Sequence, residues 1–196
     1  RRTGFVGPTV GQEPIEAGAL AVGLALLSIL LYVWFRFEWQ FGVAAIVALA
    51  HDIISTLGLF ALIQHEFNLA TVAAVLTIAG YSINDTVVIY DRVRENLRKY
   101  KKMALADLFE LSVNETLSRT TLTSGTTLLA LIAIYMFGGA VLADFALAMI
   151  WGVLVGTYSS IFVAVPLLLY TGLRRGEDEQ SEEVAVPEYE RAEREG

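Results

Sequence analysis

Long apolar segments alternate with short polar breaks along most of this 196-residue chain. A helix that crosses a bilayer needs about 20 predominantly apolar residues. Segments of that kind lie at 17–35, 41–63, 69–90, 117–137 and 142–170. Polar residues separate the first three segments, Gly138-Gly139 separates the last two, and the connection at 91–116 is much longer than the others. The pattern predicts an all-α membrane protein, a bundle of five transmembrane helices.

The positions of lysine and arginine predict the orientation of this bundle. The 91–116 connection carries six of them, Arg36 follows the first span, and Arg174 and Arg175 follow the last. The alternate connections, 64–68 and 138–143, contain none. Because basic residues are retained on the cytoplasmic side, we expect the chain to start outside the membrane and its C-terminus to be cytoplasmic.

Three regions are predicted along the chain. Residues 1–16 precede the first span, 17–175 form the transmembrane domain, and 176–196 form a disordered, solvated cytoplasmic tail. Within the domain, 91–116 is expected to form one or two amphipathic helices at the cytoplasmic interface, either bound to anionic membrane lipids or as a docking surface for a partner. An odd number of spans that begins outside, with no signal peptide before it, predicts at least one further span upstream.

Composition excludes several functional classes. The chain is 55% hydrophobic and has no cysteine and two histidines, so thiolate chemistry is excluded and a histidine-rich metal site has little scope. The net charge of −7 comes from the tail, because residues 1–176 carry 12 basic and 12 acidic groups. A neutral body without a broad basic face indicates no nucleic-acid binding. Without a phosphate-binding loop or an H-E-x-x-H motif, no cofactor and no enzymatic activity are expected.

Three ionisable residues stand inside predicted spans, where charge is costly and points to function by default: Asp52, Asp85 and Arg119. Asp85 is expected about 7 Å below the cytoplasmic end of its helix and Arg119 roughly 4–5 Å below the same surface. An ion pair between them would leave neither charge alone in a medium of low dielectric constant. Such a pair adds little stability, which favours a functional role over a structural one.

Hydroxyl groups accompany both members of this predicted pair. Tyr81 and Ser82 precede Asp85 by four and three residues, on the same helix face. Arg119 begins a predicted stripe with Thr123, Thr126 and Thr127. Such a stripe can carry water or pass protons, or the small polar residues can simply allow close helix packing. We favour packing for the neighbouring Ser124 and Gly125.

Asp52 is predicted near the centre of the bilayer, where two interpretations stay open. It is either a deeper proton-relay station or a protonated group that is hydrogen-bonded between helices. Capping and interfacial anchoring are the simplest roles for Tyr90-Asp91-Arg92, at the membrane border.

Four separated motifs resemble one known family. They are Phe5-Val6-Gly7-Pro8, Ala50-His51-Asp52, the run from Gly80 to Asn96, and Leu117-Ser118-Arg119-Thr120 leading to Thr123-Ser124-Gly125-Thr126-Thr127. They occur in the order and topology of the SecF family, the smaller halves of bacterial SecD–SecF protein-export complexes in the resistance-nodulation-division superfamily. The resemblance covers about residues 4–172. It implies that the five spans are helices two to six of a six-helix half-transporter, and that 1–16 are a remnant of a periplasmic domain.

The resemblance also implies a function and a location. Such proteins lie in the bacterial cytoplasmic (inner) membrane and use the proton-motive force to help move unfolded secretory polypeptides through the SecYEG translocon, together with SecD. The residues implied for proton coupling are Asp85, Arg119 and Thr123. Asp52 is added as a further candidate, with Tyr81, Ser82, Asn84 and Thr127 in support.

Two other functions are weighed against this one. The first is a proton-driven exporter of small molecules from the same superfamily, which would carry large periplasmic domains upstream. The second is a membrane scaffold without transport activity, which should tolerate Asp85→Asn.

Overall fold

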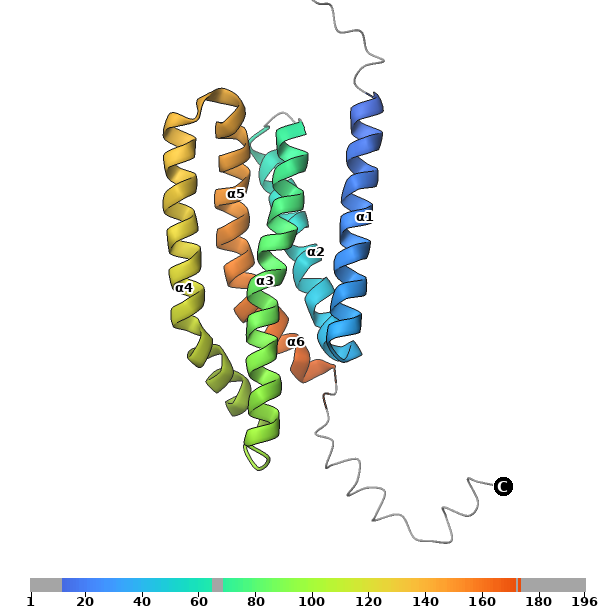
Figure 1. Ribbon diagram of the computed structural model, residues 1–196, viewed down its shortest axis with the longest axis vertical. Coiled ribbons are helices and arrows are strands. Elements are labelled where there is room, and N and C mark those ends of the chain that lie inside the picture. Colours follow the sequence, from blue (N-terminus) through green and yellow to red (C-terminus); the bar gives the residue numbers. More distant parts are fainter. Residues whose placement is uncertain (1–11, 65–68, 172, 174–196) are drawn as a thin grey trace, which may run out of the picture.

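The computed structural model describes residues 12–64, 69–171 and 173. The described residues are helical almost throughout, in the order α1 (Gln12–Arg36), α2 (Trp39–Leu62), α3 (Leu69–Lys99), α4 (Leu105–Phe137), α5 (Gly139–Ser159), a π-helical turn (Ser160–Ala164) and α6 (Val165–Tyr170). The helices run up and down side by side as one bundle (Figure 1). The predicted all-α fold is confirmed.

Four helical segments are long and apolar enough to cross a membrane: Trp39–Leu62, Ala70–Lys99, Leu105–Phe137 and Leu142–Tyr170. They contain the fourth and fifth predicted spans, and all but one end residue of the second and of the third. The first predicted span coincides with α1, whose apolar stretch in the described residues, Gly23–Arg36, is shorter than these four. The chain is thus a multi-pass membrane protein.

The 91–116 connection is helical, but it does not form separate helices. Its first part continues α3 to Lys99 and its second part is the beginning of α4, with a turn at 100–104 between them. In Figure 1 this first part of α4 bends toward the lower part of α3. The placement of this connection at a membrane interface stays a prediction.

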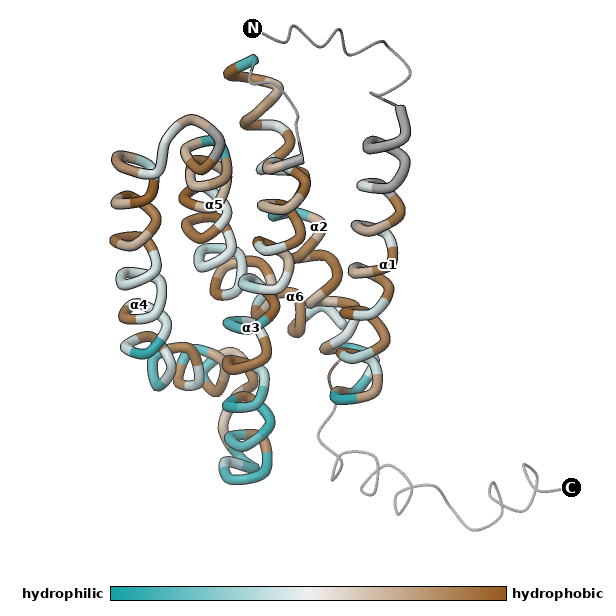
Figure 2. The backbone as a smooth tube through the Cα atoms, turned by 45° about the horizontal axis from the view of Figure 1, so that its top comes forward, coloured by the Kyte–Doolittle hydropathy of each residue, from teal (hydrophilic) through white to brown (hydrophobic). Residues whose placement is uncertain are grey.

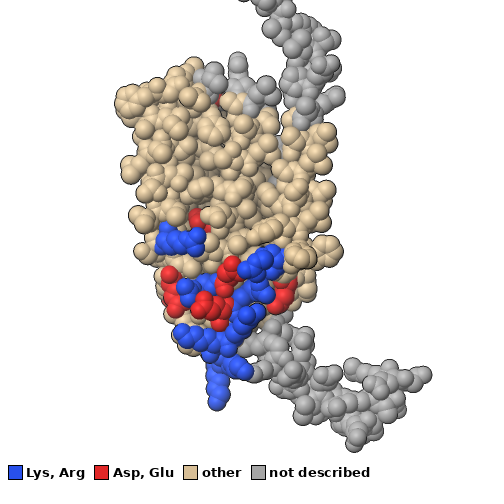
Figure 3. Space-filling model, in the orientation of Figure 1, with Lys and Arg blue, Asp and Glu red and all other residues tan. Residues whose placement is uncertain are grey.

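Charged side chains gather at the end of the bundle where α3 and α4 meet, and the rest of the visible surface is largely uncharged (Figure 3). The hydropathy of the backbone trace changes in the same way, from brown along the helices to teal at the lower end of α3 (Figure 2). Arg36, at the end of α1, lies at this polar end. The opposite end holds the α4–α5 hairpin, where Gly139 has the positive φ of 77° that favours glycine.

Two glycines of α5 allow this helix to approach α3 closely. Gly152 and Gly156 are buried one turn apart, facing Ile78 and Ser82 of α3. A Cβ atom at Gly156 would lie 3.2 Å from Ser82 Cβ, and one at Gly152 would overlap Ile78. Small residues four apart let helix backbones approach closely in membranes. This close approach brings the polar residues that follow Gly156 against the middle of α3.

A widened turn then follows in the last span. Pro166 lacks an N–H group and its ring would clash with the carbonyl four residues earlier. The π-helical turn Ser160–Ala164 ends two residues before this proline. The fully buried Tyr90 of α3 donates its hydroxyl hydrogen to the carbonyl of Ala164 at 3.2 Å. Tyr90 is therefore a core residue that stabilises this irregular turn, and its predicted role in interfacial anchoring is wrong.

Candidate functional site

Asp52 lies at the centre of a hydrogen-bonded contact between three helices. Its side chain, on α2, is fully buried. Ser82 of α3 and Ser159 of α5 both donate to its Oδ2 atom, the latter at 2.8 Å. The adjacent His51 places Nδ1 3.0 Å from Oδ1. Of the two interpretations left open by the sequence, the structure shows hydrogen bonding between helices; a relay role for Asp52 stays a prediction.

The polar contact continues along α3 toward the charged end of the bundle. Thr86 bonds to the carbonyl of Ser82 at 3.2 Å, and its Oγ1 lies 3.0 Å from Oγ of Ser160. Ser160 in turn donates to the carbonyl of Gly156 at 2.8 Å. All of these side chains are buried, so α2, α3 and α5 are joined by one polar network inside the bundle. We call Asp52, Ser82, Thr86, Ser159 and Ser160 the three-helix network.

Asp85 stands one turn from Ser82 on α3, but its carboxylate is held differently. The side chain is 4% exposed, and its Oδ2 atom is buried without a hydrogen-bond partner. Three further buried oxygens of the described residues have no partner: the hydroxyls of Tyr81, on α3, and of Thr120, on α4, and Oε1 of Gln40, on α2. An unpaired buried polar atom costs about 1–3 kcal/mol. Among the described residues, such atoms concentrate where α3 faces α4.

Arg119 stands on α4 close to the level of Asp85. Asp85 is 14 residues before the end of α3, and Arg119 is 14 residues after the start of the antiparallel α4. Arg119 interacts electrostatically with Asp85, yet no direct ion pair joins them in the described structure. The reason is the helix face: Arg119 is exposed, whereas Thr120 points into the bundle. The predicted direct pair is therefore wrong for this conformation.

The predicted hydroxyl stripe on α4 is also displaced from the buried face. Thr126 is exposed, and Thr123 and Thr127 are half-buried; all three bond to carbonyls of their own helix. The buried stripe is made by other residues spaced four apart: Ser112, Thr116, Thr120 and Ser124. Ser124 approaches Oγ1 of Thr157, on α5, at 2.7 Å, in line with the packing role predicted for it.

The residues predicted to support proton coupling also divide into buried and exposed ones. Ser82 joins the three-helix network and Tyr81 places its hydroxyl in the interior, whereas Asn84 is exposed on the outer face of α3. Sequence reasoning missed Thr86, Thr120, Ser159 and Ser160. A signal for Ser159 and Ser160 was present, because they are an adjacent polar pair within an apolar span, one turn beyond Gly156 and two turns beyond Gly152.

The described residues hold no group of three or more histidine, aspartate and glutamate side chains that could bind a metal ion. Phe5-Val6-Gly7-Pro8, the acidic tail, and Arg174 and Arg175 lie outside the described residues.

A bundle of apolar helices with two carboxyl groups and a hydrogen-bonded polar network buried inside it defines a polytopic membrane protein, in which charged groups within the spans are by default candidates for function. Comparison with a family model agrees with this class of protein. The model for the C-terminal part of the protein export membrane proteins SecD and SecF covers residues 1–174. The chain belongs to this family.

Curated relatives and solved structures support the assignment. The protein translocase subunit SecF of Rickettsia rickettsii is 54% identical over 168 residues, which are 86% of this chain and 54% of that protein. The subunit of the same name from Rhodobacter capsulatus is 54% identical over 175 residues, 89% of this chain and 53% of that one. The chain thus spans about half the length of the curated relatives it matches.

The crystal structure of SecDF from Thermus thermophilus, described as a translocon-associated membrane protein, superposes with a TM-score of 0.80 at 50% identity, over 84% of this chain and 23% of that one. A SecDF structure in a super-membrane-facing form gives 0.74 at 47% identity, over 90% of this chain and 24% of that one. At these identities the fold comparison supports the sequence match.

Proposed function

We propose that the chain is the membrane part of a proton-motive-force-dependent subunit that assists protein export, acting with SecD beside the SecYEG channel on unfolded secretory polypeptides. It would work as a transport subunit, not as an enzyme, in the bacterial inner membrane with its C-terminus in the cytoplasm. Family membership and the names of its relatives support the export role. The observation that carries the proton coupling is Asp85, a buried carboxyl group with an unpaired oxygen, in electrostatic reach of Arg119.

Asp85 can act as a switch because two influences on its charge oppose each other. Burial favours the neutral acid and the guanidinium of Arg119 favours the carboxylate. When Asp85 loses its proton, Arg119 is attracted toward it and α4 is drawn toward α3. When Asp85 is protonated this attraction is lost, and Arg119 turns toward Thr123 or the aqueous side. One elementary charge that crosses the membrane potential is worth about 2.3 kcal/mol per 100 mV, enough to bias such a change.

The outer face of α4 is the surface proposed to meet SecD. Of the four span-length helices in the described part of the chain, α4 is the least buried. A shallow groove of about 920 Å³ follows this face and includes the polar or small residues Asn114, Ser118, Thr121 and Gly125. Hydroxyl and glycine positions on a lipid-exposed surface are typical of helix–helix contacts in membranes. A second bundle on this face would also cover Arg119.

The test is proton-driven export by vesicles that contain the full-length protein in complex with SecD. Asp85→Asn keeps the shape of the side chain but cannot lose a proton, so the complex should assemble and export should lose its dependence on an imposed proton gradient. Arg119→Lys keeps the charge without the planar guanidinium and should leave partial activity. Glu95→Gln removes an exposed carboxylate from the same helix and serves as the matched control.

Normal gradient-driven export by Asp85→Asn, with Glu95→Gln also normal, would refute the assignment of Asp85. Asp52 would then become the next candidate for proton coupling.

A further inference from the structure

A charged depression lies at the polar end of the bundle, between the end of α1 and the last turns of α3. Its volume is about 570 Å³, and it is lined by Arg36, Asp91, Arg94, Glu95, Arg98 and Lys99. Four of these six side chains are cationic and two are anionic. The basic side chains in Figure 3 cluster in this part of the molecule.

Both carboxylates of the depression are already paired. Asp91 accepts from Arg36 at 2.8 Å, and Glu95 accepts from Arg92 at 3.0 Å. Among the described residues no carboxylate pairs with Arg94, Arg98 or Lys99. The depression therefore has an excess of positive charge.

One of these cations is held in place without a carboxylate. The Nη1 atom of Arg94 donates to the carbonyl of Arg36 at 3.3 Å. The guanidinium groups of Arg94 and Arg36 lie 5.5 and 5.0 Å from the centre of the Phe37 ring. These contacts hold Arg94 in place and leave some of its N–H groups available to a ligand, because a guanidinium has five N–H donors. The site is thus partly preorganised for an anion.

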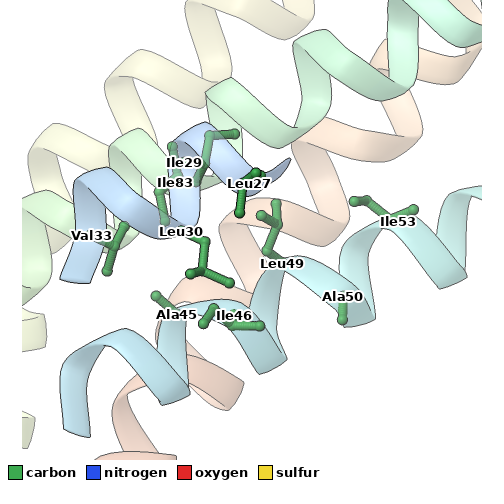
Figure 4. A pocket seen from close by; sticks show the side chains of 10 residues that line it. All are labelled: Leu27, Ile29, Leu30, Val33, Ala45, Ile46, Leu49, Ala50, Ile53 and Ile83. Atoms are coloured by element: carbon green, nitrogen blue, oxygen red, sulfur yellow. The ribbon is translucent and has the colours of Figure 1, made fainter. Parts of the chain in front are cut away.

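An apolar groove of about 320 Å³ lies between α1 and α2, with α3 behind it. Figure 4 shows side chains of α1 and α2 on both sides of this groove and Ile83 of α3 at the back. The residues that line it are Leu27, Ile29, Leu30, Val33, Ala45, Ile46, Leu49, Ala50, Ile53 and Ile83, all of them apolar. The groove suits a hydrocarbon chain and offers a polar ligand no partner.

One face of α3 connects the groove with the depression. Ile83, Asp91, Arg94 and Arg98 follow the spacing of one helical stripe, so the face changes from apolar to basic as it leaves the bundle. On α1, Val33 lines the groove and Arg36, one turn later, lines the depression. Ile83 and Arg94 are 11 residues apart, about 16 Å along the helix. One leaflet of the hydrocarbon core is about 15 Å thick.

We propose that the depression and the groove together bind one anionic phospholipid. Its phosphate lies against Arg94, Arg98 and Lys99, and an acyl chain occupies the groove between α1 and α2. The excess positive charge selects an anionic headgroup, and the apolar groove next to it selects a lipid over a soluble phosphate. Basic pockets between helices at a membrane surface bind lipid headgroups of this kind.

The test measures lipid binding to the full-length protein, in complex with SecD and in detergent, by native mass spectrometry. The probes are dioleoylphosphatidylglycerol, dioleoylphosphatidylcholine and glycerol 3-phosphate, which carries the anionic group without acyl chains. We expect the first to bind more tightly than the other two. The double variant Arg98→Gln, Lys99→Gln should weaken it by about 30-fold, which corresponds to roughly 2 kcal/mol. The control pair Lys101→Gln, Lys102→Gln removes equal charge from the adjacent turn and should weaken it less than about threefold.

The groove is tested separately by filling it. Ala50→Phe should weaken phosphatidylglycerol binding by about tenfold, and the control Ala61→Phe, at another exposed position of α2, should leave it unchanged.

Three results would overturn the proposal. The first is an equal loss of binding for the two charge-removing pairs. The second is binding of glycerol 3-phosphate as tight as that of the lipid. The third is normal lipid binding by Ala50→Phe, even where the variant disturbs helix packing or assembly with SecD.

Discussion

The contact between α3 and α5 depends on a missing side chain at Gly152, and Gly152→Ala should weaken it. A Cβ atom there would lie 2.2 Å from Cγ1 and 2.4 Å from Cδ1 of Ile78, which is itself 1% exposed. Overpacking a filled interior costs about 1–3 kcal/mol. A value near the top is expected because isoleucine in a helix has one strongly preferred χ1 rotamer and Cγ2 of Ile78 also lies only 2.9 Å from the added Cβ atom. Replacing a helical glycine by alanine returns about 0.5–1 kcal/mol. The net loss is then about 2 kcal/mol.

Two other glycines provide the comparison. At Gly156 the nearest atom to a new Cβ, Ser82 Cβ, is 3.2 Å away, and at Gly58 no atom lies within 4 Å. Gly156→Ala should therefore have a smaller effect, and Gly58→Ala should be neutral or slightly stabilising. Thermal unfolding of the purified full-length protein in detergent measures the order. With about 2–4 °C for each kcal/mol, Gly152→Ala should lower the midpoint by roughly 4–8 °C.

The partner residue makes the prediction specific. Ile78→Ala removes the atoms that overlap, so adding it to Gly152→Ala should cost less than the two single changes together. If Gly152→Ala unfolded at the same temperature as Gly58→Ala, or if the double variant were strictly additive, the close approach of α3 and α5 would be wrong.

Two further predictions follow from the buried contacts, and a third follows from the predicted topology. Asp52→Leu should destabilise the protein by about 3 kcal/mol or more, because two buried hydroxyl donors lose their acceptor, whereas Asp52→Asn should retain much of the stability; thermal unfolding distinguishes them. Tyr90→Phe should cost about 1–2 kcal/mol by the same assay, since the carbonyl of Ala164 loses its donor. A single cysteine placed within 138–143, at the α4–α5 hairpin of this cysteine-free chain, should react with a membrane-impermeant reagent from outside; labelling only from the cytoplasm would reverse the predicted topology.

The helices were predictable because their signals are local and long. Runs of about 20 apolar residues, a Gly-Gly break and one-sided basic connections need no knowledge of tertiary contacts. The ends were less predictable, since α3 continues nine residues past Tyr90 through a polar, helix-favouring sequence. Hydrophobicity marks the membrane core, and it says nothing of how far a helix extends beyond it.

The ionisable residues of the site were predictable, whereas several of its hydroxyl residues and most of its contacts were not. Asp52, Asp85 and Arg119 stand out because charge is rare inside a span. Which neighbour each one contacts depends on helix rotation, and one residue along a helix is about 100° of rotation. That step separates Arg119, which is exposed, from Thr120, which is buried. The contacts of Asp52 with Ser82 and Ser159 come from elements 30 and 107 residues away, which no local pattern encodes.

The two buried carboxylates differ in a way that assigns them different work in the proposed cycle. Asp52 joins α2, α3 and α5 through side-chain hydrogen bonds, so a change in its charge would have to break contacts that hold the bundle together. Asp85 faces a helix to which it makes no direct bond, and one of its oxygens is unpaired. In the proposed cycle a proton binds or leaves there at a small structural cost. The proposed mobile element is α4, which is less buried than the other span-length helices in the described structure, and the three-helix network would hold α2, α3 and α5 together as the frame against which it moves.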